Sequence, residues 1–309
     1  MDLTRKRNLF LAITVVLVVA IVAVSAVILV RGPRESSVEL VSNNGDGTAT
    51  VNDINDGNMT IPYYDINVNT YKLQDFKAGS NGTIVYEGGD SFVGINVNSQ
   101  MGAIDWAQVK QSGVDFALIR VGWRGKTNGN IVLDSNFQAN IEGALAAEIP
   151  VGVYFYSKAV TTEEAEAEAT FVLEQIRNYQ VTWPIAFFWE YDTNDDGSQD
   201  QSSRTIACNG EQVTSFIKAF CDKIELAGFT ASYYADKTMA YETLQLDQLT
   251  SYDLWYAEYR AQPGFYYDFG MWQYTCKGIV SGIDGYVDLN LSYKNYAKII
   301  KKGGYNHLT

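Results

Sequence analysis

From Phe92 onward, short apolar runs alternate with segments whose apolar residues recur at helical spacing. This alternation is typical of parallel α/β architecture. The runs predict eight strands, over Val93–Val97, Phe116–Val121, Val151–Tyr156, Ile185–Tyr191, Thr230–Tyr234, Leu254–Tyr259, Met271–Tyr274 and Tyr286–Leu289. The helical pattern covers Asp105–Ser112, Ser135–Ala147, Thr162–Asn178 and Gly210–Ala227, with a shorter helix over Lys237–Leu244. The last three strands follow one another too closely for full helices, so we predict a TIM-like (β/α) barrel with reduced helices after the late strands.

The N-terminal part begins with an unbroken apolar run over Leu9–Val30. At ~1.5 Å per helical residue, its 22 residues span roughly 33 Å, which is enough to cross a bilayer. Arg5, Lys6 and Arg7 precede the run, so the positive-inside rule places everything after Arg34 outside the cytoplasm. A cleavable signal peptide is the alternative, but its apolar part usually has only ~7–15 residues. Both alternatives export the remainder of the chain.

Four segments follow from these patterns. Residues 1–34 form a cytoplasmic stub and a single transmembrane signal anchor. Residues 35–60, rich in Asn, Gly, Asp, Ser and Thr, predict a flexible polar tether. Short aromatic and β-branched runs in residues 61–91 predict a small β-rich extension, and residues 92–309 form the barrel domain.

Charge and rare residues narrow the possible chemistry. The formal net charge of −13 argues against nucleic acid as a partner and favours a neutral or cationic ligand. The only histidine is His307, which nearly excludes Ser-His-Asp catalysis and histidine-ligated zinc. Cys208, Cys221 and Cys276 show no CxxC spacing, and we expect buried apolar thiols.

The most informative strand is Ile185–Tyr191, because it carries Glu190 near its end and Phe188 two positions earlier. Residues i and i+2 of a strand point to the same face. Glu190 and Asp288 both lie at predicted strand ends, where barrels place their sites. A sugar-cleaving site normally holds two cooperating carboxyl groups. One acid beside one phenyl ring therefore indicates a site that has lost part of its chemistry.

Several motifs resemble glycoside hydrolase family 25, the lysozyme-like muramidases. The segment Gly94–Gly102 followed by Ile104-Asp105-Trp106 is similar to the family's opening GIDVSxxQGxIDW. Residues 151–157 resemble its third strand, 184–190 the strand bearing D-x-E, and 272–290 its WQYT…VDLN ending. The resemblance covers about residues 92–292 and implies binding of the β-1,4-linked glycan of bacterial peptidoglycan.

The resemblance also implies four acidic positions, which in this chain are Asn96, Phe188, Glu190 and Asp288. Glu190 matches the family's general acid. Phe188 replaces an aspartate thought to stabilise positive charge on the sugar, and a phenyl ring carries no charge to do so. Asn96 keeps the shape of aspartate but cannot accept a proton or neutralise a cation. We therefore expect hydrolysis to be lost or strongly reduced.

Binding is expected to survive better than catalysis. Aromatic and polar side chains at predicted strand ends are suited to stacking on sugar rings and bonding their substituents. The candidate ligand-binding residues are Arg120, Tyr154, Tyr156, Trp255, Tyr259, Trp272 and Gln273, with Trp123 nearby. About half of the aromatic residues are expected to be barrel packing instead.

An acidic loop follows the Glu190 strand. Asp192, Asn194, Asp196 and Asp200 match the first part of a calcium loop, although Ser203 stands where the bidentate glutamate belongs. A solvated turn is the default interpretation and a structural calcium site the alternative. No cofactor is required.

These patterns predict a single-pass protein of a bacterial cell membrane whose extracytoplasmic barrel binds peptidoglycan or a related glycan. One alternative is an active muramidase with Glu190 as general acid and with its carboxylates rearranged around Glu190, Asp192 and Asp288. The other is a protein-interaction module that binds no sugar.

Overall fold

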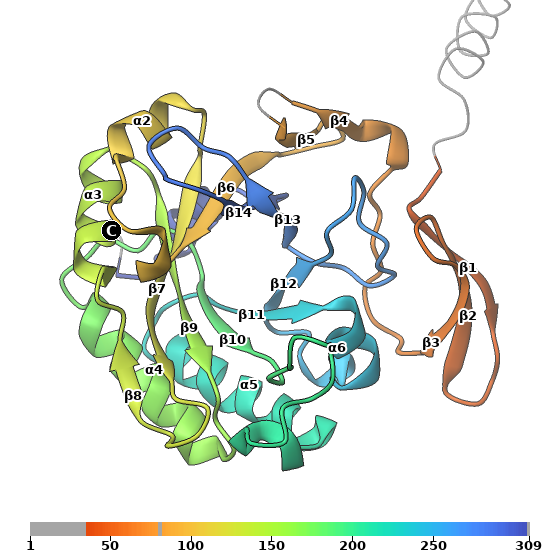
Figure 1. Cartoon of the computed structure of the whole chain (residues 1–309). Coiled ribbons are helices and arrows are strands. Elements are labelled where there is room, and N and C mark those ends of the chain that lie inside the picture. Colours follow the sequence, from red (N-terminus) through yellow and green to blue (C-terminus); the bar gives the residue numbers. More distant parts are fainter. Residues whose placement is uncertain (1–34, 80–81, 308–309) are drawn as a thin grey trace, which may run out of the picture.

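A computed structural model describes residues 35–79 and 82–307, and a closed barrel of eight strands forms its centre (Figure 1). Seven neighbouring strands are parallel, and β14 closes the barrel by pairing antiparallel with both β13 and β6. The barrel strands are β6 (Phe92–Val97), β7 (Phe116–Arg124), β9 (Val151–Ser157), β10 (Ile185–Trp189), β11 (Ala231–Asp236), β12 (Asp253–Ala257), β13 (Met271–Gly278) and β14 (Val287–Ser292). All eight predicted strands are confirmed. A short strand that the pattern did not predict, β8 (Ile131–Leu133), pairs with the end of β7.

The five predicted helices are also confirmed, with ends that differ by at most two residues. They are α2 (Trp106–Gln111), α3 (Phe137–Ala146), α4 (Thr162–Ile176), α5 (Gly210–Leu226) and α6 (Lys237–Glu242). Side-chain caps explain several starts, since Asp105, Thr161, Asn209 and Asp236 each accept a hydrogen bond from a backbone N–H of the first turn. Single 3₁₀ turns cover Leu73–Asp75, Ser99–Met101, Arg204–Ala207 and Leu246–Gln248. No full helix lies between β12 and β13 or between β13 and β14, as expected.

One further helix, α7 (Tyr296–Gly303), follows β14 and was not predicted. Its buried residues Tyr296 and Ile300 belong to the apolar cluster that fills the barrel interior, together with Phe116, Leu118 and Trp183. The helix therefore covers the end of the barrel opposite the carboxyl ends of the parallel strands. A second and larger apolar cluster lies between the outer faces of the strands and the elements around them.

Residues 35–60 are not the predicted flexible tether. They contain most of a three-stranded antiparallel sheet, the N-terminal sheet, made of β1 (Val38–Asn43), β2 (Thr48–Asp53) and β3 (Gly57–Pro62). The Asn, Gly and Asp residues that indicated flexibility form its two tight turns, with Gly45, Gly47 and Gly57 at positive φ. Ala49, Val51 and Asp53 alternate with more exposed residues and face the body of the molecule.

The expected small extension exists as the two-stranded sheet of β4 (Phe76–Ala78) and β5 (Ile84–Tyr86) with the loops around it. Its aromatic rings cover the outer faces of the late strands, where helices are missing. Tyr71 stacks on Tyr293 at 3.9 Å between ring centroids, and Phe76 contacts Trp272 edge-on at 5.8 Å. Parallel sheets require cover on both faces, and this extension supplies it where the barrel lacks helices.

The predicted membrane anchor at residues 9–30 lies outside the described residues. Within residues 35–79 and 82–307, no helix has the length and apolar character needed to span a membrane.

Candidate functional site

Asn96, on β6, forms the centre of a buried polar network inside the barrel. Its amide nitrogen donates to Asp288 Oδ2 at 2.6 Å, and its amide oxygen accepts from Gln273 Nε2 at 3.0 Å and Asn290 Nδ2 at 2.9 Å. Asp288 and Asn96 are register partners on β14 and β6, which explains their contact. Burial raises the pKa of Asp288, and the bond from Asn96 lowers it in part. Two of the four predicted acidic positions therefore lie together.

Phe188 occupies the interior face of β10, as its spacing from Glu190 predicted. Its ring stacks on Tyr234 of β11, with centroids 3.7 Å apart and an interplanar angle of 16°. The ring also contacts Tyr156 and Trp255 edge-on at 5.3 and 5.8 Å. An aromatic cluster thus fills the position where the resemblance places a carboxylate.

Glu190 follows directly after β10, and its carboxyl oxygen Oε1 accepts a hydrogen bond of 2.8 Å from the Tyr156 hydroxyl. Burial raises the pKa of Glu190, while the bond from Tyr156 and the charge of Lys158 oppose the shift. A raised pKa keeps a carboxyl group protonated to higher pH, which is what a proton donor requires.

Asp192 is not placed to replace the missing carboxylate. Its Oδ1 forms a 3.1 Å ion pair with Lys158 Nζ, and its Oδ2 accepts a 2.6 Å hydrogen bond from Ser203. Lys158 is fully buried and also donates to the backbone oxygen of Glu190 at 2.7 Å. The alternative of an active muramidase used Asp192 as a replacement carboxylate. Both oxygens of Asp192 are already bonded, one to Lys158 and the other to Ser203.

Six of the seven predicted ligand-binding residues divide into three groups. Tyr156 and the half-exposed Tyr259 lie at the carboxyl ends of the strands, and the Tyr259 hydroxyl donates to Gln273 Oε1 at 3.0 Å. The side chains of Gln273, Tyr154 and Trp255 face the barrel interior but are nearly or fully buried. They therefore pack beneath the site and are not exposed to a ligand. Arg120 is committed to a 2.8 Å ion pair with the buried Asp134, and its guanidinium lies over the Trp123 ring.

Trp272 was wrongly assigned to the site. It is fully buried on the outer face of β13, where its indole nitrogen donates to the backbone oxygen of Glu258 and its ring contacts Phe76. Neighbouring residues of a strand point to opposite faces, so the inward position of Gln273 requires Trp272 to point outward.

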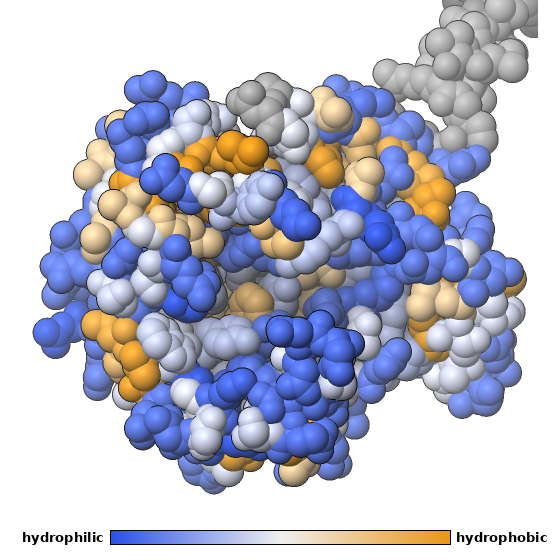
Figure 2. All heavy atoms as spheres, in the orientation of Figure 1, coloured by the Kyte–Doolittle hydropathy of each residue, from blue (hydrophilic) through white to orange (hydrophobic). Residues whose placement is uncertain are grey.

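Other residues at the site were missed. Asp236, at the end of β11, lines the same cavity as Glu190, together with Thr193, Gln199 and Met239. This cavity has a volume of about 310 Å³. Figure 2 shows the molecule hollowed at the centre of the face seen in Figure 1, with hydrophilic side chains around the hollow. Asp236 stands at a strand end and caps a helix, and these two signals could have identified it.

The side chains of the acidic loop, for which a solvated turn is the default interpretation and a calcium site the alternative, have other partners in the structure. Asp192 pairs with Lys158, Asp196 accepts hydrogen bonds from Ser198, and Asp200 forms a 2.7 Å ion pair with Lys126. Asn194 bonds to Ser198. In the part of the chain that the structure describes, no group of three or more His, Cys, Asp and Glu side chains could hold a metal ion. Cys208, Cys221 and Cys276 are free thiols, and the first two are buried.

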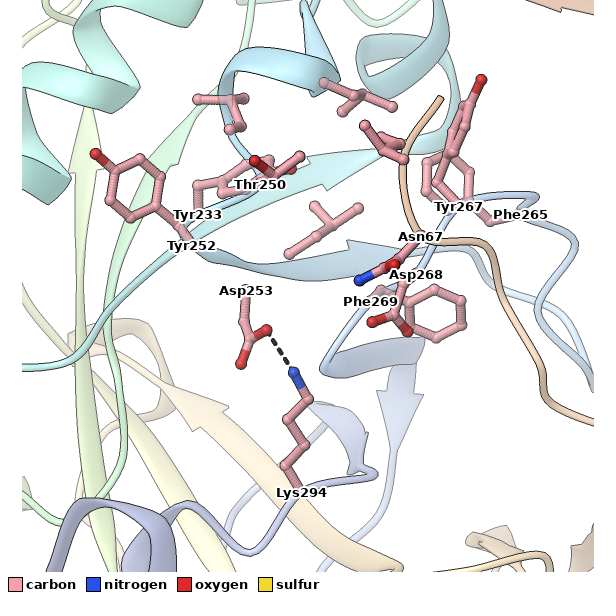
Figure 3. A pocket seen from close by; sticks show the side chains of 14 residues that line it. Asn67, Tyr233, Thr250, Tyr252, Asp253, Phe265, Tyr267, Asp268, Phe269 and Lys294 are labelled. Carbon is pink, nitrogen blue, oxygen red and sulfur yellow. Dashed lines mark hydrogen bonds and ion pairs between the residues drawn. The ribbon is translucent and has the colours of Figure 1, made fainter. Parts of the chain in front are cut away.

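A second cavity lies on the outer face of β11 and β12, between these strands and the extension (Figure 3). Its volume is about 250 Å³, and apolar side chains such as Leu246, Leu249 and Phe269 line it. Asp253 and Lys294 form a 2.5 Å ion pair at its polar end. The cavity is remote from Glu190, because Asp253 begins β12 while Glu190 follows the end of β10.

An eight-stranded α/β barrel with carboxyl groups at the carboxyl ends of its strands is the arrangement of barrel glycoside hydrolases. The chain belongs to the glycosyl hydrolases of family 25, because the sequence model of that family matches residues 95–283. It is 26% identical over 202 residues to an autolytic lysozyme of Clostridium acetobutylicum, which covers 64% of this chain and 54% of that protein. The chain thus spans about half the length of this curated relative.

Solved structures share the fold. The modular autolysin LytC of Streptococcus pneumoniae is 22% identical and superposes with a TM-score of 0.55, covering 82% of this chain and 58% of that one. A family 25 glycosyl hydrolase of Bacillus anthracis is 23% identical with a TM-score of 0.55, covering 67% of this chain and 91% of that one. The predicted family and barrel are confirmed.

Proposed function

We propose that this protein binds peptidoglycan or a related bacterial glycan at the mouth of its barrel, with hydrolysis lost or strongly reduced. The substrate class is supported by the relatives, since one is an autolytic lysozyme and LytC has also been solved with a synthetic peptidoglycan ligand. The half-exposed ring of Tyr259 and the raised pKa of Glu190 support a sugar site that keeps its shape and its proton donor.

The stacked pair of Phe188 and Tyr234 carries the proposal of weakened hydrolysis. Glycoside hydrolysis normally uses a second carboxyl group beside the proton donor. The ring of Phe188 fills that position, Asn96 is neutral, and Asp192 is bonded to Lys158 and Ser203. Glu190 therefore lacks the partner that the family pattern provides.

One observation favours the alternative of an active muramidase. Asp236 lines the same cavity as Glu190, and its charge contributes to the raised pKa of Glu190. Its carboxyl group accepts a 2.7 Å hydrogen bond from the Met239 backbone and is otherwise available to the cavity. If the protein hydrolyses glycan, Asp236 is the acid expected to assist, and Asp236→Asn would abolish the activity.

We also propose that the apolar run at residues 9–30 holds the protein at the membrane with the barrel on the extracytoplasmic side. The run's length and the preceding cations support this location. Fractionation of cells that express the full chain tests it, because an anchored protein remains with the membranes after a high-salt wash.

The decisive experiment measures binding and hydrolysis on the same purified cell wall, with the full chain in detergent micelles. The parent is expected to sediment with the wall and to release no reducing sugar. The double variant N96D/F188D restores both acids, and since one electrostatic partner is commonly worth ~10²–10³ in turnover, it should gain at least roughly 10²-fold.

Two further variants control this experiment. F188L opens space without adding a carboxylate, so it should remain inactive if charge is what the site lacks. Y259A should weaken sedimentation with the wall. Family-like hydrolysis by the parent would refute the loss of activity. Absence of any sedimentation with the wall would instead favour a protein-interaction module.

A further inference from the structure

Lys237, the first residue of α6, is surrounded by three carboxyl groups from distant parts of the chain. Its Nζ lies 2.9 Å from Asp53 Oδ2, 2.6 Å from Asp56 Oδ2 and 2.8 Å from Glu258 Oε1. Asp53 and Asp56 belong to the N-terminal sheet and its turn, whereas Glu258 directly follows β12. One ammonium group thus joins the N-terminal sheet to the barrel.

The contact between the N-terminal sheet and the barrel is also sterically close. Asn55 Nδ2 donates to Glu258 Oε1 at 3.2 Å and to the backbone oxygen of Gln262 at 3.0 Å. A Cβ atom added to Gly264 would meet the Asp53 carboxylate at 2.4 Å, so a side chain there would have to displace that carboxylate. The Asp53 side chain is completely buried. Removing the Lys237 charge would leave this carboxylate without its cation.

The same cluster shapes the loop that carries Tyr259. Glu258 Oε2 accepts hydrogen bonds from the Gly264 backbone N–H at 2.5 Å and from the Tyr256 hydroxyl at 3.0 Å, which closes the loop over residues 258–264. Tyr259 is the next residue, and its hydroxyl donates to Gln273, which in turn donates to Asn96. A bonded route therefore connects the N-terminal sheet to the polar network of the barrel mouth.

We propose that Lys237 is a positioning residue, through which the N-terminal sheet fixes Tyr259 at the mouth and so sets the affinity for glycan. This inference rests on the proposed function, because it assigns the sheet to the same glycan site. The sheet is then a part of the binding machinery and not only a covering or a spacer.

The test is a double-mutant cycle in the full chain, with binding of a soluble peptidoglycan oligosaccharide measured by calorimetry. K237M should weaken binding about tenfold, which corresponds to about 1.4 kcal/mol. In a Y259A background, K237M should change the affinity less than about twofold, because the effect passes through Tyr259. K237R should restore most of the loss, and K298M, at an exposed lysine of α7, should have no effect.

Amide hydrogen exchange gives a second measurement that requires no glycan. In K237M the Gly264 N–H should exchange faster, while core amides of β9 and β10 keep the parent's rates. Equal losses of affinity from K237M with and without Tyr259, or unchanged exchange at Gly264, would overturn the inference. If the parent binds no oligosaccharide, the proposed function fails, and the exchange rates still decide whether Lys237 positions the loop.

Discussion

At the scale of single residues, Asn96 satisfies its surroundings as a neutral amide. Its amide donates to Asp288 and accepts from Gln273 and Asn290 at the same time. An ionised carboxylate cannot donate a hydrogen bond, and two carboxylates in contact cannot both remain ionised. The neutral residue is therefore integrated into a satisfied network, which is consistent with a site whose polar core is retained as structure.

Glu190 leads to a prediction about pH and stability. Burial raises its pKa above the ordinary value of 4.5, so the folded protein binds this proton more tightly than the unfolded chain does. Its contribution to stability is therefore complete below the unfolded pKa and is lost as pH rises through the folded pKa. We expect E190Q to become more stable relative to the parent between about pH 4 and pH 8, as measured by urea unfolding.

The matched control is E174Q, at an exposed position of α4. Its difference from the parent gives the effect of removing a charge at an exposed position over the same range. A difference for E190Q that stays flat or shrinks with rising pH would contradict the assignment of a buried, proton-retaining carboxyl group.

At the scale of elements, the turn after β10 depends on one buried cation. Lys158 bonds to the Glu190 carbonyl and to Asp192, and its ammonium group lies 4.6 Å from the centre of the Tyr156 ring. Together these contacts hold the Glu190 carbonyl and the side chain of Asp192, two residues further along the chain. Burial lowers the pKa of Lys158, while the charges of Asp192 and Glu190 oppose the shift.

K158M should therefore be costly, because it leaves Asp192 and a backbone carbonyl without their partner. Breaking a buried pair by removing one member typically costs about 3–5 kcal/mol of unfolding free energy. The double variant K158M/D192N should recover part of that loss, since it removes the uncompensated charge. Urea unfolding of the single and double variants measures the coupling. Equal stability of K158M and the parent would show that the turn does not depend on this pair.

The elements also show what the sequence could and could not predict. The barrel strands are predominantly apolar runs that alternate with helical segments, and their signal survives without tertiary information. The N-terminal sheet was missed because its strands are partly polar, and because Asp53 occupies an inward position whose cation, Lys237, lies 184 residues away. Pairings of this kind depend on the folded arrangement and leave no local pattern.

The candidate site also contains residues that the sequence could locate and contacts that it could not predict. Glu190 follows the end of β10 as predicted, whereas Asp288 lies at the start of β14 and faces Asn96 because β14 runs antiparallel to its neighbours. Trp272 and Gln273 were both assigned to the interior, although alternation permits only one of them. The links from Lys158 to Asp192 and from Tyr259 to Gln273 could not be predicted, since they depend on side-chain directions beyond the strands.

At the scale of the whole molecule, residues 35–91 cover the outer faces of the late barrel strands, which helices cover elsewhere in the barrel. Tyr71 and Phe76 cover Phe269, Tyr293 and Trp272, which would otherwise face solvent. Deleting 35–91 should therefore yield a barrel that aggregates or unfolds at a much lower temperature. Deleting only 35–62 should cost less, because the extension around Tyr71 and Phe76 remains. Thermal unfolding with size-exclusion chromatography compares the two, and a stable monomeric 92–309 fragment would refute this role.

The attachment of residues 35 and 36 to the body of the molecule bears on how far the barrel can lie from a membrane. The Glu35 carbonyl accepts a 3.0 Å hydrogen bond from the Leu73 backbone, and Ser36 forms a β-bridge with Lys72, so the chain is fastened to the body there. If residues 9–30 cross the bilayer as proposed, residues 31–35 alone separate the lipid from this fastening, and fully extended they span at most roughly 18 Å. The barrel would then reach only the layer of wall nearest the lipid.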